Sequence, residues 1–135
     1  MKLPAVLLTL AFILVAKFAG AADWTPAAWT DEETLQFRTD CPDEAEHWSY
    51  VWLVVLDGDV WVRLGAKAGG RVDCSKTKPL AAVKIAGQEF ASVEMVNVPE
   101  MAERVAAAMG EKYMTDIFVR YMDHPYTMKL VPKTE

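Results

Sequence analysis

The chain has 135 residues, 53% of them hydrophobic and 24% charged, and a formal net charge of −5 at pH 7. This length suits one domain with a single hydrophobic core, and the sequence contains neither an internal repeat nor a low-complexity tract. The acidic balance, without any basic run, argues against nucleic acid and anionic membrane surfaces as partners.

Residues 1–22 have the layout of a secretory signal peptide. A basic start at Lys2 precedes the apolar run from Leu3 to Ala16, and small residues at Ala19-Gly20-Ala21 suit cleavage by signal peptidase. The run is shorter than the roughly 20 apolar residues of a membrane-spanning helix, although an uncleaved anchor remains the alternative. We therefore expect a periplasmic or secreted protein without a stable membrane span after cleavage.

Residues 23–33 form a lead-in segment, with one helical turn expected over residues 30–33, and residues 34–135 form the folded domain. From Leu35 to Thr39, apolar and polar side chains alternate as in a half-buried strand. The acidic stretch from Asp40 to His47 predicts a solvated turn. It also combines carboxylates, a thiol and an imidazole, but their spacing matches no standard metal site.

The stretch from Trp48 to Leu64 predicts a β-hairpin with a two-residue type I′ turn at Asp57-Gly58. This turn sets three cross-strand pairs: Leu56 with Asp59, Val54 with Trp61, and Trp52 with Arg63. One face of the hairpin is aliphatic: Val51, Leu53, Val55, Val60, Val62 and Leu64. The other face is largely aromatic: Trp48, Tyr50, Trp52, Val54, Trp61 and Arg63. Because a sheet that is apolar on both faces can leave neither fully wet, the aromatic face needs a ligand, another subunit or another element to cover it.

The later elements complete a β-rich fold. Residues 65–79 predict a connection with a short helix, and residues 80–85 and 88–96 predict a hairpin that turns at Ala86-Gly87. Asn97 or Val98 caps a helix that runs from Pro99 to about residue 112, a shorter helix is expected over 115–122, and a closing strand over 126–131. Six short strands with one or two helices predict a mainly β, α+β fold: a six-stranded antiparallel barrel.

The two cysteines, Cys41 and Cys74, both lie in the exported part of the chain. In an oxidising compartment they either close a disulfide, which would contribute on the order of 3–4 kcal/mol, or remain separate thiols. Thiol catalysis is not expected without a C-x-x-C pair. The histidines, His47 and His124, lie in polar, turn-like settings and are expected to be surface or structural residues, with haem or metal ligation as the alternative.

The segment VWVRLGAKAGGRVDCSKTKPLAAV, residues 60–83, resembles the pyridoxamine 5′-phosphate oxidase-like, FMN-binding split β-barrel superfamily, in particular its small bacterial members. In element order the likeness extends over residues 35–132. It implies a split barrel with Greek-key-like connections, and a homodimer that holds FMN or a deazaflavin between its subunits. The phosphate would lie on the cationic turn after the third strand. There Lys67 keeps one of two family cations, whereas Ala66 and Ala68 replace a hydroxyl and the second cation.

Eight residues are candidates for cofactor binding: Trp52, Trp61, Arg63, Lys67, Arg71, Ser75, Lys76 and Thr77. We identify no candidate catalytic group. Arg63 can stack on an indole, donate to an anionic ligand, or pair with an acid at a dimer interface.

Three functions therefore remain open for this small-molecule site. The chain is an exported flavin-binding oxidoreductase, a non-catalytic relative that binds another small molecule or dimerises, or a haem-associated barrel. FMN is made inside the cell, and the signal lacks the twin-arginine pair of a route for preloaded proteins. Export therefore argues against the first function.

Overall fold

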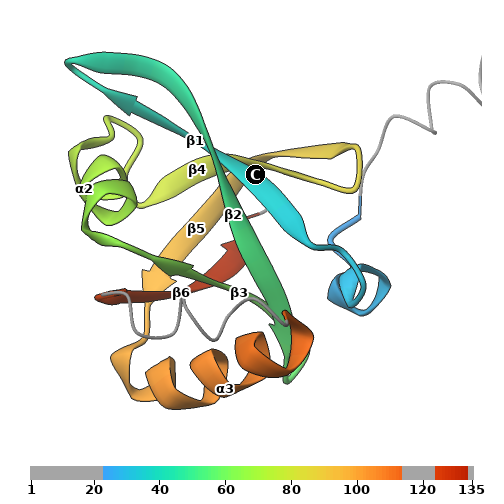
Figure 1. Cartoon of the computed structure of the whole chain (residues 1–135). Helices are drawn as coiled ribbons and strands as arrows, with labels where there is room; N and C mark the ends of the chain where they lie inside the picture. The colour runs from blue at the N-terminus through green and yellow to red at the C-terminus, as the bar shows by residue number, and fades with distance from the viewer. Residues whose placement is uncertain (1–22, 114–123, 134–135) are drawn as a thin grey trace, which may run out of the picture.

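The computed structural model describes residues 23–113 and 124–133 (Figure 1). In this part of the chain six strands close into an antiparallel barrel in the order β1-β2-β3-β6-β5-β4. The strands are β1 (Thr34–Cys41), β2 (Glu44–Leu56), β3 (Asp59–Leu64), β4 (Leu80–Ile85), β5 (Gln88–Asn97) and β6 (Tyr126–Pro132). The helical elements are the 3-10 turns η1 (Pro26–Trp29) and η2 (Pro99–Met101) and the α-helices α2 (Ala66–Cys74) and α3 (Ala102–Lys112). The predicted fold class is confirmed.

Both predicted hairpins form in the predicted register. In the first, Val54 pairs with Trp61 and Leu56 with Asp59, as predicted. The third predicted pair, Trp52 with Arg63, lies just beyond the last paired residues, Leu53 and Val62. Asp57 and Gly58 take φ values of 55° and 79°, as a type I′ turn requires. The second hairpin turns at Ala86 and Gly87, with φ values of 53° and 78°, and pairs Lys84 with Glu89 and Val83 with Phe90.

Two local predictions need correction. The turn expected over residues 40–47 is much shorter, because β1 continues to Cys41 and pairs with β2 from Glu44 onward. Backbone pairing between the two strands therefore outweighs the turn-forming composition of this stretch. The helical turn of the lead-in lies at residues 26–29 rather than 30–33. Pro26 is its first residue, and the fixed φ of proline suits the start of a helix. The predicted helix over 115–122 and residues 1–22 lie outside the described residues.

The aliphatic face of the first hairpin lines the inside of the barrel. Leu53, Val60 and Val62 are fully buried there beside Phe37 of β1. The lead-in also contributes, because Trp29 is buried and packs edge-to-face against Trp24 and Phe90. The core therefore begins before the first strand.

Part of the aromatic face is covered by another element of the same chain. Helix α3, orange in Figure 1, packs against β2 and β3. Its Val105 and Met109 form a second apolar cluster with Val54 and Trp61 of the hairpin. Val54 and Trp61 are therefore covered by another element of the same chain rather than by a ligand or another subunit.

Helix α2 lies tightly against β6 at Gly69. A side chain at this position would overlap the ring of Tyr126, whereas a side chain at the neighbouring Gly70 would meet nothing within 4 Å. We expect Gly69→Ala to lower the free energy of unfolding by about 1–3 kcal/mol through overpacking. Gly70→Ala in the same helix is the matched control and should raise it by about 0.5–1 kcal/mol. Urea denaturation of both variants checks this, and equal midpoints would contradict the close packing.

Candidate ligand-binding site

The part of the aromatic face that α3 leaves open borders a hollow of about 290 Å³. This volume is near the lower end for small-molecule sites. Its lining residues come from five segments of the chain: Thr34, Tyr50, Val51, Trp52, Arg63, Met109 and His124. Tyr50 is 71% exposed, so the hollow has an aromatic rim that the described part of the chain does not cover.

Trp52, which lines this hollow, stacks on the buried ring of Tyr113. Trp52 and Tyr113 lie with their ring centroids 4.4 Å apart and their planes 8° from parallel. Tyr113 itself is buried, and its hydroxyl oxygen lies 2.6 Å from the carbonyl oxygens of Glu33 and of Leu53. Burial raises the pKa of Tyr113 to about 12, so the hydroxyl stays protonated and can donate at neutral pH. This hydrogen bonding holds the ring behind Trp52 in place.

Lys112, the last residue of α3, strengthens the same attachment. Its Nζ atom donates to the carbonyl of Leu53 at 3.1 Å and to the carbonyl of Glu32. Burial lowers the pKa of Lys112, while the carboxylates of the adjoining acidic segment, residues 31–33, act in the opposite direction. The C-terminal end of α3 is thus tied by hydrogen bonds to the chain before β1 and to the C-terminal part of β2, beside Trp52.

Arg63 and His124 meet at the polar side of the hollow. An Nη atom of Arg63 lies 3.1 Å from Nδ1 of His124. A guanidinium can only donate, so Nδ1 accepts this hydrogen bond, and the neutral imidazole carries its proton on Nε2. Sequence reasoning treated His124 as a surface or structural residue. Its partner lies 61 positions earlier in the chain, and no local pattern indicated the contact.

Of the eight predicted site residues, Trp52 and Arg63 line this hollow. Trp61 is 3% exposed beneath α3, and its Nε1 donates to the carbonyl of Leu56 at 3.2 Å.

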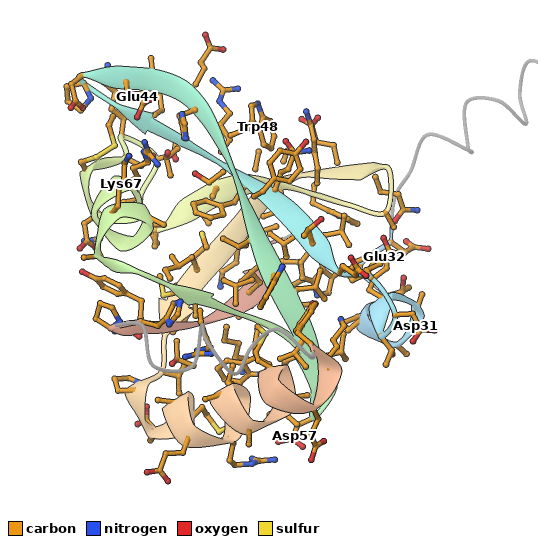
Figure 2. All side chains as sticks on the ribbon, viewed as in Figure 1. Asp31, Glu32, Glu44, Trp48, Asp57 and Lys67 are labelled. Carbon is orange, nitrogen blue, oxygen red and sulfur yellow. A yellow bond between two sulfur atoms is a disulfide. The ribbon has the colours of Figure 1, made fainter. Side chains whose placement is uncertain are left out.

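Lys67 and Arg71 lie elsewhere, on α2. They border a hollow that also contains Glu44 and Asp43 (Figure 2 shows Lys67 and Glu44). Nε of Arg71 lies 3.0 Å from a carboxylate oxygen of Glu44. The two cations therefore face two carboxylates, and neither lines the hollow beside Trp52.

The remaining three predicted residues follow α2. The hydroxyl of Ser75 accepts a hydrogen bond from the backbone N–H of Asp40 at 2.9 Å. The hydroxyl of Thr77 donates to the carbonyl of Leu80 at 2.7 Å. Lys76 is exposed. The two hydroxyls thus hold the connection between α2 and β4 in shape.

A disulfide joins Cys41 at the end of β1 to Cys74 at the end of α2, with 5.3 Å between their Cα atoms. Of the two states that the sequence left open for these cysteines, the paired one is present.

A second hollow, of about 370 Å³, adjoins the first and shares Thr34 and Tyr50 with it. Its other lining residues are mostly polar: Glu32, Leu35, Gln36, Lys84, Ala86, Gly87, Gln88 and Glu89. Nζ of Lys84 lies 4.0 Å from the centroid of the Trp48 ring, a cation–π contact.

Within residues 23–113 and 124–133, no group of three or more His, Cys, Asp or Glu side chains is placed to hold a metal ion. None of the helices in the same part of the chain has the length and hydropathy to cross a membrane.

The closed six-stranded order and the two helices define the chain as a protein with the split β-barrel fold. It is similar to HutZ, the haem storage protein of Vibrio cholerae, with 18% identity and a TM-score of 0.58 over 81% of this chain and 88% of that one. It is also similar to the conserved hypothetical protein Rv2991 of Mycobacterium tuberculosis, with 20% identity and a TM-score of 0.51 over 77% and 74% of the two chains. No protein-family model and no curated protein matches the sequence. At these identities the likeness concerns the fold alone.

Proposed function

We propose that this chain is an exported split-barrel protein that binds a flavin-type ring in the hollow beside Trp52. We call this hollow the ring site and define it by Tyr50, Trp52, Arg63, Met109 and His124. The stacked pair of Trp52 and Tyr113 carries the proposal, because a rigid, flat aromatic wall favours a planar conjugated ligand. Arg63 adds a group that donates hydrogen bonds and suits the carbonyl oxygens on the edge of such a ring.

A second copy of the chain is the proposed cover for the open side of the ring site. Tyr50 is exposed at its rim, and a planar ligand lying on Trp52 would leave its other face in water. A homodimer is also what the resemblance to the FMN-binding superfamily implies.

The phosphate of FMN does not fit the residues present. Lys67, which keeps one cation of the family turn, borders a different hollow together with Asp43 and Glu44. Arg71 is paired with Glu44. A phosphate placed there would meet two carboxylates as well as the two cations, so its charge would be poorly compensated. The proposal therefore concerns the flavin ring, and any redox chemistry would come from that ring.

Haem is the second candidate, favoured by one observation of the site. His124 and Met109 line the same hollow, and both residue types serve as axial ligands of haem iron. The contact with Arg63 argues against ligation, because it occupies Nδ1 of His124 and leaves the proton on Nε2. An iron would have to displace Arg63 or shift that proton. HutZ is a haem storage protein, so haemin belongs in the test.

The disulfide supports the proposed location outside the cytoplasm. Bonds of this kind form and persist in oxidising compartments such as a periplasm or the extracellular space. Together with the signal-like start of the sequence, it favours export.

The proposal is tested with lumiflavin, which is the bare flavin ring. We expect the purified mature chain to quench lumiflavin fluorescence saturably, and Trp52→Ala to weaken binding about tenfold, which corresponds to the loss of about 1.4 kcal/mol of stacking. Trp48→Ala is the matched control, because Trp48 lies on the same face of β2 but lines neither hollow, and it should bind normally.

The other outcomes point elsewhere. A Soret band on adding haemin, without any response to lumiflavin, would replace flavin by haem. A chain that ignores both ligands yet elutes as a dimer would make the aromatic face a non-catalytic dimerisation surface. Equal losses in the Trp52 and Trp48 variants would contradict the ring site.

A further inference from the structure

We infer that the flavin bound here carries an uncharged, hydroxyl-rich tail, as riboflavin does, rather than the phosphorylated tail of FMN. The inference rests on the proposed function and concerns the second hollow, which we call the tail site and define by Glu32, Gln36, Lys84, Gln88 and Glu89. It follows from where this hollow lies and from the charges that line it.

The tail site continues the ring site along β1. The two hollows share Thr34 and Tyr50, so the surface between them is common to both. In the sheet, Thr34 pairs with Trp52 of the ring site, and Gln36 pairs with Lys84 of the tail site. Two residues along a strand correspond to about 7 Å. A short chain attached to a ring on Trp52 can therefore reach the tail site by passing over the exposed ring of Tyr50.

The charges of the tail site disfavour a phosphate. Glu32 and Glu89 contribute two carboxylates, whereas Lys84 is the one cation among its described lining residues. Lys84 is also held over the Trp48 ring by its cation–π contact. A phosphate monoester carries close to two negative charges at neutral pH and would be repelled by the two carboxylates.

The uncharged side chains of the tail site suit a polyhydroxyl chain. Gln36 and Gln88 each provide an amide oxygen that accepts and an amide nitrogen that donates, and Thr34 adds a hydroxyl that does both. A sugar alcohol also donates and accepts at every hydroxyl, and its donors can use the carboxylates of Glu32 and Glu89 as well. The same two carboxylates that repel a phosphate thus bind a ribityl chain.

The experiment compares three ligands that differ only in the tail: lumiflavin, riboflavin and FMN. Fluorescence titrations of the mature wild-type chain at low salt should show riboflavin binding at least as tightly as lumiflavin, and FMN about tenfold more weakly than riboflavin. Raising the ionic strength should narrow the difference in affinity between riboflavin and FMN, because salt screens the repulsion between the phosphate and exposed carboxylates.

A double variant tests the source of the selectivity. Glu32→Gln with Glu89→Gln keeps the size and polarity of both side chains and removes both charges. It should raise the affinity for FMN about tenfold and change the affinity for lumiflavin less than about twofold. The control is Glu103→Gln with Glu111→Gln, which changes the net charge by the same amount at exposed positions of α3 that line neither hollow. It should leave the ratio of the affinities for FMN and lumiflavin unchanged.

The results separate the inference from the proposed function. If lumiflavin fails to bind, the ring site itself is wrong. If lumiflavin binds but the wild-type chain binds FMN as tightly as riboflavin or more tightly, the ring proposal stands and the inference about the tail is overturned. The wild-type comparison decides this even if the double variant fails to fold.

Discussion

Replacing Trp61 by alanine should lower the free energy of unfolding by about 3–5 kcal/mol, the usual effect of deleting a large aromatic side chain from a core. Trp61 is 3% exposed and lies between the barrel wall and α3, where it contacts the cluster that contains Val105 and Met109. Its Nε1 also donates to the carbonyl of Leu56. The variant would lose the packing that attaches α3 to the sheet and leave a cavity there. Urea denaturation monitored by circular dichroism measures the change.

The matched control is Trp48→Ala on the neighbouring strand. Trp48 is partly exposed and contacts Lys84, so removing its side chain should lower the free energy of unfolding clearly less than removing that of Trp61. Trp61 was also a candidate for cofactor binding, and the comparison tests that role. If Trp61→Ala kept normal stability and lost only lumiflavin binding, the residue would belong to the ligand site rather than to the attachment of α3.

Removing the disulfide should have the second large effect. A Cys41→Ala, Cys74→Ala double variant is expected to lose about 3–4 kcal/mol, because the bridge closes a long loop and restricts the unfolded chain. The bond spans 33 positions and joins the end of α2 to the end of β1. The hydrogen bond from Asp40 to Ser75 and the ion pair of Arg71 with Glu44 lie in the same region and would remain in the variant. The measurement is the urea midpoint of the variant against the oxidised wild-type chain.

Chemical reduction provides the control for this variant. Wild-type protein in excess dithiothreitol should match the double variant, because both lack the same cross-link. Under conditions in which the variant is folded, its affinity for lumiflavin should equal that of the wild-type chain, since neither cysteine lines the ring site or the tail site. An oxidised wild-type chain no more stable than the variant would show that the loop is already constrained without the bond.

The hairpins could be predicted because their signals are local. Asp57-Gly58 and Ala86-Gly87 each set a register that the structure confirms, since a two-residue turn leaves few ways to pair the strands beside it. The alternating side chains of residues 51–64 likewise placed Leu53, Val60 and Val62 inside the barrel. The start of β2 was missed because the turn-like composition of residues 40–47 gives way to pairing with β1, which is not local.

The candidate site was predicted only in part, because its members come together through contacts between distant positions. Trp52 and Arg63 were identified from the aromatic face of one hairpin, and both line the ring site. Tyr113, which backs Trp52, and His124, which contacts Arg63, lie 61 positions away from those partners. Neither has a local feature that distinguishes it from an ordinary core or turn residue.

By itself the sequence determined that this chain forms a small, acidic, six-stranded antiparallel barrel with an aliphatic inside and an aromatic outer face. The charge follows from composition, and the strands and their two faces follow from alternation and turn chemistry within about a dozen residues. The barrel follows from the number and order of the predicted strands and helices. Only the tertiary structure decided that α3 covers Trp61, that Cys41 bonds Cys74, and that the candidate cations on α2 face carboxylates rather than the ring site. Each of these depends on how separate elements pack in space, which no local pattern specifies.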